Sequence, residues 1–289
     1  MRRNSNCEYT QGPFVLTGSL PLAMKHQEAD GTPSTSLQAI DDQLGRSIAN
    51  SGNAGIQLWL FPLNLSVAEY SVVSGLLSRD ERERASRYTN EALKRDFEIG
   101  RGLLRYLIGA YFDMHPAQIC FDNGPTGKPS VGFPLDGDQL QFNFSHSGGW
   151  AIMGVAFGDS IGVDIERIRA FDDYLDVARS NFTDVEFQWL KTQRSSERLS
   201  AFYSCWTRKE AVVKADGIGI GYGLDRFEIP FDASGDTGFA QVHDPSGRLA
   251  GLHVQGFVPL EGFCGAVSVR SARPVVQWYR PLVERCGNT

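Results

Sequence analysis

The sequence has few of the residues that cross-link a chain or hold a transition metal. Its five cysteines are scattered over 289 residues without a CxxC pair, and no histidine has the spacing of a metal ligand. We therefore expect reduced thiols and neither a zinc site nor a disulfide framework. No run approaches the roughly 20 apolar residues of a membrane helix, and the mildly apolar stretch 13–24 is interrupted by glycine and proline. We expect a cytoplasmic protein without membrane contact, with a signal peptide as the weaker alternative.

The chain also lacks an excess of basic charge. Its 28 Lys and Arg residues stand against 34 Asp and Glu residues, which gives a net charge of -6 at pH 7. A protein that mainly grips nucleic acid phosphates needs a basic face, so we expect no nucleic acid partner. Hydrophobic residues make up 42% of the chain, which is enough to bury a core. At this length the chain suits one large or two medium domains.

Hydrophobic periodicity divides the chain into helical and extended segments. Residues 1–54 are rich in small polar residues without a sustained period, which predicts a poorly ordered extension. The pattern then predicts a strand at 56–61, two or three helices over 66–112, strands over 117–166, helices at about 172–192 and 197–216, and strands near 226–231, 252–258 and 263–269. The order β, α, β occurs twice, which indicates two similar lobes.

Two acids stand two residues apart in the predicted strand IGVDIE. Asp164 and Glu166 therefore project from the same face of that strand. Neighbouring carboxylates repel each other, and a hard cation such as Mg²⁺ relieves the repulsion while leaving positions open for phosphate. The alternative is a strand that leaves the core with both acids in solvent, and the pair alone favours this alternative.

A second group of polar residues has helical spacing. Trp206, Glu210 and Lys214 recur every four residues and lie along one face of the predicted helix 197–216. The alternative is a surface salt bridge, which contributes only about 0.3–0.5 kcal/mol. The tryptophan on the same face and the glycine-rich run 217–223 after the helix indicate instead that the pair borders a packed cleft.

A third group lies at the end of the strand FNFSHS. Ser145 and His146 are adjacent, so they point to opposite faces and cannot work as a nucleophile and its base. They suit contacts to phosphate or hydroxyl groups better. The alternative is a polar strand end before a turn at Gly148 and Gly149.

In this order and spacing the three groups resemble the Sfp-type 4'-phosphopantetheinyl transferase family. The GxDxE motif of the family is matched by Gly162, Asp164 and Glu166, and its WxxKExxxK motif by Trp206, Lys209, Glu210 and Lys214. SHS at 145–147, GKP at 127–129 and GRGLLR at 100–105 look like further family blocks. The resemblance covers about residues 56–230.

The resemblance implies an enzyme that moves the phosphopantetheine arm of coenzyme A onto a serine of an apo acyl or peptidyl carrier protein. Adenosine 3',5'-bisphosphate is then released. It also implies an α+β fold of two similar lobes, with the active site in the cleft between them. We expect these lobes at 55–162 and 163–289, in a chain that works as a monomer.

The resemblance also implies roles for individual residues. Mg²⁺ would be held by Asp164, Glu166 and Glu210, with Glu210 and Lys214 acting in catalysis and Lys214 also contacting the coenzyme. Ser145 and His146 would hold coenzyme phosphates, while Arg84, Lys128 and Pro129 would lie near the 3'-phosphate and the adenine. Arg84 stands where the family often has lysine. Glu186, in FTDVE, corresponds to the residue proposed in relatives as the base for the carrier serine.

Two other function classes compete with this interpretation. The first is a non-catalytic module that binds coenzyme A or a carrier protein. The complete set of acids with Lys214 argues against it, because a binding module has no need of a metal. The second is another Mg²⁺-dependent phosphoryl transferase such as a kinase, which would show a P-loop or a kinase signature, and the sequence contains neither.

Overall fold

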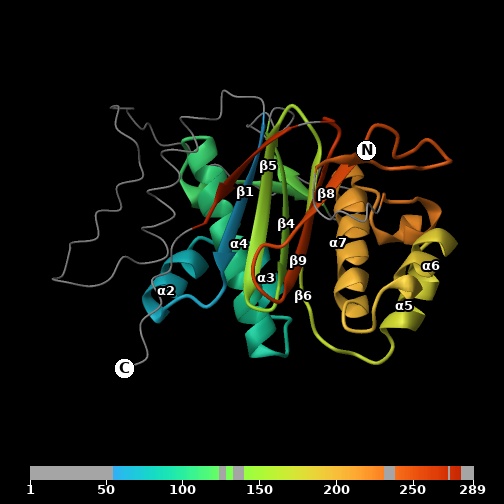
Figure 1. Cartoon of the computed structure of the whole chain (residues 1–289). Coiled ribbons are helices and arrows are strands. Elements are labelled where there is room, and N and C mark those ends of the chain that lie inside the picture. The colour runs from blue at the N-terminus through green and yellow to red at the C-terminus, as the bar shows by residue number, and fades with distance from the viewer. Residues whose placement is uncertain (1–54, 124–127, 133–139, 231–237, 273, 281–289) are drawn as a thin grey trace.

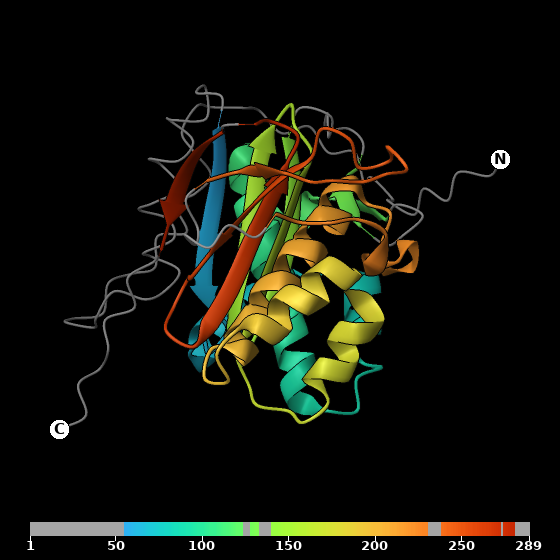
Figure 2. The same cartoon turned by 45° about the vertical axis from the view of Figure 1, so that its right-hand side comes forward.

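The computed structural model describes residues 55–123, 128–132, 140–230, 238–272 and 274–280. The predicted extension at 1–54 lies outside the described residues. Eight of the described strands form two four-stranded sheets that lie side by side, with helices on the outer side of each, and the other two form a small sheet (Figures 1 and 2). The predicted α+β class with two lobes is confirmed.

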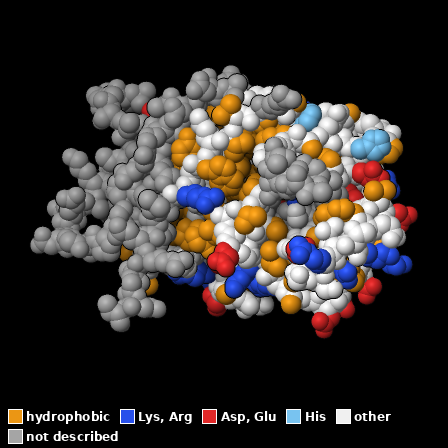
Figure 3. All heavy atoms as spheres, in the orientation of Figure 1, with side chains coloured by type: hydrophobic (Ala, Val, Ile, Leu, Met, Phe, Trp, Pro, Cys, Tyr) orange, Lys and Arg blue, Asp and Glu red, His pale blue; other side chains and the backbone are white. Residues whose placement is uncertain are grey.

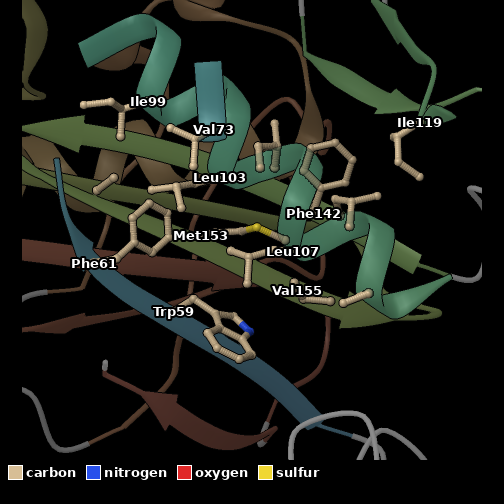
Figure 4. Close-up of a cluster of buried hydrophobic side chains, with 14 of the residues drawn as sticks. Trp59, Phe61, Val73, Ile99, Leu103, Leu107, Ile119, Phe142, Met153 and Val155 are labelled. Carbon is tan, nitrogen blue, oxygen red and sulfur yellow. The ribbon is translucent and has the colours of Figure 1, made fainter. Parts of the chain in front are cut away.

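The N-terminal lobe is built on the first sheet. Its strands, in pairing order, are β10 (Val275–Tyr279), β1 (Gly55–Pro62), β5 (Trp150–Phe157) and β4 (Leu140–Ser147). The helices are α2 (Val67–Gly75), α3 (Arg79–Ala85) and α4 (Glu91–Tyr111), with the 3-10 turn Pro116–Gln118 and a small sheet of β2 (Phe121–Asn123) and β3 (Pro129–Val131). Leu103 and Leu107 of α4 pack with Trp59, Phe61 and Met153 of the sheet (Figure 4). Burial of these side chains holds α4 on the sheet.

The GRGLLR block shapes the packing of α4. A Cβ atom at Gly102 would lie 2.3 Å from the carbonyl oxygen of Val73, so only glycine lets α4 approach α2 this closely. Arg105, in the same block, is buried. Its Nε pairs with Glu81 at 2.6 Å and its Nη1 donates to the carbonyl of Ile119 at 2.7 Å. This block therefore maintains the packing of the N-terminal lobe.

The C-terminal lobe is built on the second sheet. Its strands, in pairing order, are β6 (Ile161–Arg167), β9 (Phe263–Val269), β8 (His253–Phe257) and β7 (Ala240–Gln241). Its helices are α5 (Tyr174–Asn181), α6 (Asp184–Thr192) and α7 (Arg198–Asp216), followed by 3-10 turns at Ile220–Tyr222 and Leu224–Arg226. A strand was expected at 226–231, but within 226–230 the structure has only an isolated bridge from Glu228 to His243. The long helix α7 packs across β6, β8 and β9.

A third core joins the two sheets. Ile56 and Leu58 of β1 and Ile152 of β5 pack against Ile161 and Val163 of β6, all of them nearly or fully buried. These side chains come from the sheet faces that the helices leave uncovered. The lobes are therefore held together by apolar packing, and β4 and β6 run beside each other where they meet.

The end of the chain does not stay in the C-terminal lobe. β10 pairs in parallel with β1, from Gly55↔Val275 to Trp59↔Tyr279. The Tyr279 ring stacks on Trp59 at 4.4 Å between centroids, while Trp278 meets the Phe257 ring of β8 edge to face at 4.8 Å. The division of the chain into lobes at 55–162 and 163–289 stays a prediction. β10 departs from it, because this strand lies within 163–289 but pairs in the first sheet.

The described surface and cysteines bear on two further expectations. No helix of the described residues is both long and apolar enough to span a bilayer. Hydrophobic side chains gather in the middle of the face that Figure 3 shows, beside the residues drawn in grey.

Cys205 and Cys264 are buried thiols, as expected. Cys120 is disulfide-bonded, so the expectation of reduced thiols throughout is wrong for this residue.

Candidate active site

A ladder of side-chain contacts joins β4 to β6 where the lobes meet. The Asn143 Oδ1 atom accepts from the Val163 amide at 2.9 Å, and the Ser145 hydroxyl donates to Asp164 Oδ1 at 2.7 Å. One step further along both strands, the Ser147 hydroxyl donates to a Glu166 oxygen at 2.6 Å. Alternate residues of each strand face the other lobe, as the two-residue period of a strand requires. Asp164 and Glu166 therefore share a face, as predicted.

Helix α7 brings the other two charged groups to this ladder. The Lys214 ammonium lies 2.5 Å from Asp164 Oδ1 and 3.3 Å from the Ser145 oxygen. Glu210, one turn earlier, is buried, and its pKa responds to Lys214, Asp164 and Glu166. The structure thus brings together the acids of the GxDxE strand with the Glu and Lys of α7. We call Ser145, Asp164, Glu166, Glu210 and Lys214 the carboxylate cluster.

The close approach of α7 to β6 depends on one glycine. A Cβ atom at Gly162 would lie 2.0 Å from the carbonyl oxygen of Ala211 and 2.3 Å from the amide nitrogen of Ala215. These are backbone atoms, which cannot turn away as a flexible side chain does. Gly162 therefore sets the distance between the strand that carries Asp164 and the helix that carries Lys214.

The charges in the cluster do not balance. Burial raises the pKa of Glu210, and the nearby Asp164 and Glu166 raise it further against the opposing effect of Lys214. Burial also raises the pKa of Glu166, while the hydrogen bond from Ser147 lowers it. Asp164 Oδ2 and Glu210 Oε1 are buried without a hydrogen-bond partner. Three carboxylates thus face one ammonium group, and two of their oxygens lack a partner.

These unpartnered oxygens fit a hard cation. Unpaired buried carboxylate oxygens are unfavourable unless a donor or a cation reaches them. The set is made entirely of oxygen, as Mg²⁺ prefers. Between residues 55 and 280, the described residues contain no group of three His, Cys, Asp or Glu side chains already arranged to hold a metal ion. In this structure the ammonium of Lys214 is the cation in contact with Asp164.

Ser145 and His146 point in different directions, as predicted. Ser145 is buried in the ladder, whereas the ring of His146 is exposed on the other side of β4, 6.0 Å from the Phe144 ring between centroids. Partial burial lowers the pKa of His146, and the charge of Lys214 lowers it further. The carboxylate of Asp96 opposes this shift. His146 is therefore mostly neutral at pH 7 and able to donate one hydrogen bond.

An aromatic pocket opens beside the cluster. Its volume is about 230 Å³, and it is lined by Glu166, Phe171, Val177, Phe202, Tyr203 and Trp206. Trp206 lies one turn before Glu210 on α7, so the helical stripe seen in the sequence does border a hollow. The pocket joins an apolar wall to one of the three carboxylates. Phe171, Phe202 and Tyr203 were not recognised in the sequence, because they follow no motif.

Lys209 and Glu186 form a buried ion pair instead of facing the cluster. The Lys209 ammonium lies 2.7 Å from Glu186 Oε2 and donates to the carbonyls of Leu224 and Phe227, also at 2.7 Å. Glu186 Oε2 accepts from the Thr183 amide, and Oε1 from the Ile229 amide. Glu186 is the third residue of α6 and closes a capping box with Thr183. The pair ties α6 and α7 to the segment 224–229.

The interpretation of Glu186 as the general base stays a prediction, and these contacts count against it. Only 1% of Glu186 is exposed, and both of its oxygens are occupied. A base must come within hydrogen-bond reach of the carrier serine. Removal of its charge would leave the Lys209 ammonium buried and unpaired, which makes Glu186 important for stability.

Glu186→Gln separates the two roles. The structure predicts a loss of about 3–5 kcal/mol in the free energy of unfolding, because the variant breaks a buried ion pair. Urea denaturation measures this loss. The control Glu197→Gln removes an exposed partner of Arg194 and should cost at most about 1 kcal/mol. A variant of normal stability whose turnover falls and loses its acid-side pH dependence would instead assign the base to Glu186.

The remaining predicted residues lie in the N-terminal lobe. Arg84 is exposed on α3, with its guanidinium 5.1 Å from the centre of the Phe97 ring. Burial lowers the pKa of Arg101, and the nearby Arg84 lowers it further. Pro129 is the first residue of β3. The Lys128 ammonium donates to the carbonyls of Ile161 and Ala215. Their contacts to a coenzyme stay predictions.

Comparison with known proteins adds an independent observation. A family model described as the 4'-phosphopantetheinyl transferase superfamily matches residues 160–266, and one described as 4'-phosphopantetheinyl transferase, N-terminal, matches residues 64–157. The 4'-phosphopantetheinyl transferase HetI of Nostoc sp. is 34% identical over 174 residues, which make up 60% of this chain and 73% of that protein.

Two Bacillus subtilis proteins are similar over nearly the same length. The 4'-phosphopantetheinyl transferase ffp is 30% identical over 59% of this chain and 74% of its own length, and Sfp is 29% identical over 60% and 75%. The crystal structure of Thermotoga maritima holo-[acyl-carrier-protein] synthase aligns with 38% of this chain and 61% of its own, at 18% identity and a TM-score of 0.28. That overlap is too small to compare the two folds.

Proposed function

The chain belongs to the 4'-phosphopantetheinyl transferase superfamily, and from this premise we propose that it transfers the phosphopantetheine arm of coenzyme A to a serine of an apo carrier protein. The other product is adenosine 3',5'-bisphosphate. The observation that carries the proposal is the carboxylate cluster, which places three acids and one lysine at the junction of the lobes. Transfer to a serine breaks a diphosphate, and such a site can neutralise its charge.

Mg²⁺ is the metal that this cluster suits, held by Asp164, Glu166 and Glu210. Its support is the two buried carboxylate oxygens without a partner, one on Asp164 and one on Glu210. When bound, the metal would neutralise the diphosphate and favour attack on the phosphorus atom. The raised pKa values of Glu166 and Glu210 would return toward their ordinary range beside a cation.

The chain's own residues would orient and balance the coenzyme. Lys214 reaches Asp164 and Ser145 from α7, so its ammonium can turn to the phosphoryl group that the serine attacks. His146, on the open side of β4, can donate to a coenzyme phosphate. Arg84 and Pro129 are proposed for the 3'-phosphate and adenine by resemblance alone, whereas the ammonium of Lys128 is bonded to two backbone carbonyls.

The aromatic pocket suits the phosphopantetheine arm. The arm is a flexible chain in which a gem-dimethyl group and short methylene segments alternate with amides, and the pocket offers Phe202, Tyr203 and Trp206 as a wall for the apolar parts. Glu166 lines the same pocket, so an arm placed there would enter beside the cluster. The exclusion of water from this wall would strengthen the electrostatic contacts of the cluster.

Glu186 is poorly placed to accept the proton of the carrier serine, because both of its oxygens are occupied. Glu210, as a proposed ligand of the cation, would be a poor base while the cation is bound. We also propose a cytoplasmic monomer. In support, both lobes of the site come from one chain, so no second copy is needed to complete the cluster.

Intact mass spectrometry tests the proposed function. Several apo carrier proteins are incubated with coenzyme A, Mg²⁺ and this protein, with a matched sample that lacks Mg²⁺. A gain of one phosphopantetheine on any carrier supports the proposal, and carrier variants with alanine in place of the modified serine should show none. Coenzyme or carrier binding without any mass gain would favour a non-catalytic binding module.

His146→Ala tests the contact to the coenzyme. Loss of one hydrogen bond to a charged phosphate should raise the KM for coenzyme A by about 10- to 100-fold. Turnover at saturating coenzyme should stay near the wild-type value, because the phosphate contact is made before and during the reaction alike. The control His115→Ala changes an exposed histidine of the N-terminal lobe. Turnover that saturating coenzyme fails to restore would instead make His146 catalytic.

A further inference from the structure

Lys128 connects the N-terminal lobe to two elements of the C-terminal lobe. Its ammonium donates to the carbonyl oxygen of Ile161 at 3.0 Å and to that of Ala215 at 3.2 Å. Ile161 is the first residue of β6, and Ala215 is the last but one of α7. A single side chain thus bridges the start of the strand and the end of the helix that together form the carboxylate cluster.

Both bridged carbonyls lie next to residues of the site. Ala215 directly follows Lys214, and Ile161 directly precedes Gly162, where the backbone of α7 touches β6. The last carbonyls of a helix have no partner within the helix and carry partial negative charge. A cation from another segment is therefore a favourable cap for the end of α7. The cap acts one residue from the lysine that contacts Asp164.

The location of Lys128 is unfavourable for an ordinary surface lysine. Burial lowers the pKa of Lys128 from 10.5 to about 8, although the carboxylate of Asp216 raises it. The group is still mostly protonated at pH 7, and carbonyl dipoles replace much of its water. A charged group that is retained despite this desolvation is typical of functional sites.

We propose that Lys128 is a positioning residue that fastens the end of α7 to the start of β6 and thereby holds Lys214 against Asp164. This role differs from the coenzyme contact that the resemblance implies, since both of its hydrogen bonds go to the protein backbone. The effect of this residue on turnover rests on the proposed function, whereas the attachment of α7 to β6 does not.

The kinetic test compares two substitutions with two substrates. Lys128→Met keeps most of the side-chain length and removes the ammonium, while Lys128→Arg keeps a cation that can donate to carbonyls. Lys128→Met should lower kcat about 10- to 100-fold, because small displacements of a reacting group have effects of this size. The decrease in kcat should be equal for coenzyme A and 3'-dephospho-coenzyme A, and KM should change less than about 2-fold. Lys128→Arg should restore most of the activity.

Two kinetic results would overturn the proposal. A raised KM for coenzyme A, with no effect on 3'-dephospho-coenzyme A, would show that Lys128 binds the 3'-phosphate. An unchanged kcat with both substrates would show that the bridge does not position Lys214.

Hydrogen exchange tests the bridge without any activity. Amides near the end of α7, around residues 211–217, should exchange faster in Lys128→Met than in the wild type, and those of α6 should be unchanged. Equal protection at the end of α7 would overturn the proposal. If the wild type modifies no carrier protein but the exchange difference is present, the proposed function fails while the bridge stands.

The pH dependence of the free energy of unfolding is a second test of the bridge. The ordinary pKa of lysine is 10.5 and that of Lys128 in the fold is about 8, so the unfolded chain holds this proton more tightly between these values. The free energy of unfolding of the wild type, relative to Lys128→Met, should therefore increase as the pH rises from 8 to 10.5. Asp216 is the charged neighbour that opposes this shift. A difference that does not change with pH would show that the ammonium is not buried at the bridge.

Discussion

Asp164→Ala and Glu210→Gln are each expected to lower phosphopantetheine transfer by at least about 10³-fold, since each removes an oxygen ligand of the proposed cation. The fold should survive, because neither change empties an apolar core. The Glu210 carboxylate is buried, has an unpartnered oxygen and lies near Asp164 and Glu166. Its neutralisation relieves repulsion, so Glu210→Gln should melt at or above the wild-type temperature.

The measurement pairs turnover, as a function of Mg²⁺ concentration, with thermal unfolding. Glu197→Gln is the matched control, because it changes an exposed acid at the N-cap of the same helix. Wild-type turnover of either cluster variant at ordinary Mg²⁺ levels would show that the metal assignment is wrong. A loss of activity together with a large loss of stability would mean that the acids serve the fold.

Gly162→Ala should be nearly as damaging, although it adds only a methyl group and touches no substrate. The added carbon would overlap backbone atoms of Ala211 and Ala215, so α7 must move away from β6. Overpacking of this kind destabilises by about 1–3 kcal/mol. Displacement of Glu210 and Lys214 by about 1 Å from Asp164 should lower turnover by about 10²-fold.

Gly75→Ala is the control for Gly162→Ala. A Cβ atom at Gly75 meets nothing within 4 Å, and this residue ends α2 without a positive φ. Alanine there should be neutral or stabilising by up to about 1 kcal/mol. Turnover and urea denaturation of the two variants give the comparison. A fully active Gly162→Ala would show that the spacing of α7 and β6 is not critical.

The parts of the site that the sequence predicts follow simple periods. A two-residue spacing placed Asp164 and Glu166 on one face of a strand, and a four-residue spacing placed Glu210 and Lys214 on one face of a helix. Ser147 obeys the same two-residue rule and contacts Glu166. The alternation of Asn143, Ser145 and Ser147 in NFSHS is the sequence signal for this contact.

The partners of the lysines could not be predicted from patterns. Lys209 and Glu186 are 23 positions apart, and no local spacing indicates that they meet. A glutamate in a capping box is usually a surface residue, so its burial depends on the packing of α6 against α7. Lys128 contacts backbone carbonyls, which every residue has, and its partners are therefore invisible in a sequence.

The parallel pairing of β10 with β1 has a consequence for how the molecule is made. Gly55 and Val275 are partners 220 positions apart, so an edge strand of the N-terminal lobe leaves the ribosome only after the strands β6 to β9 of the other lobe. Multidomain chains usually complete their first unit during synthesis. Here the first sheet cannot complete before the second lobe has been translated, and such distant pairing is slow. Biogenesis therefore joins the two lobes in time as well as in space, because Trp59 can stack on Tyr279 only after β6 to β9 have been synthesised.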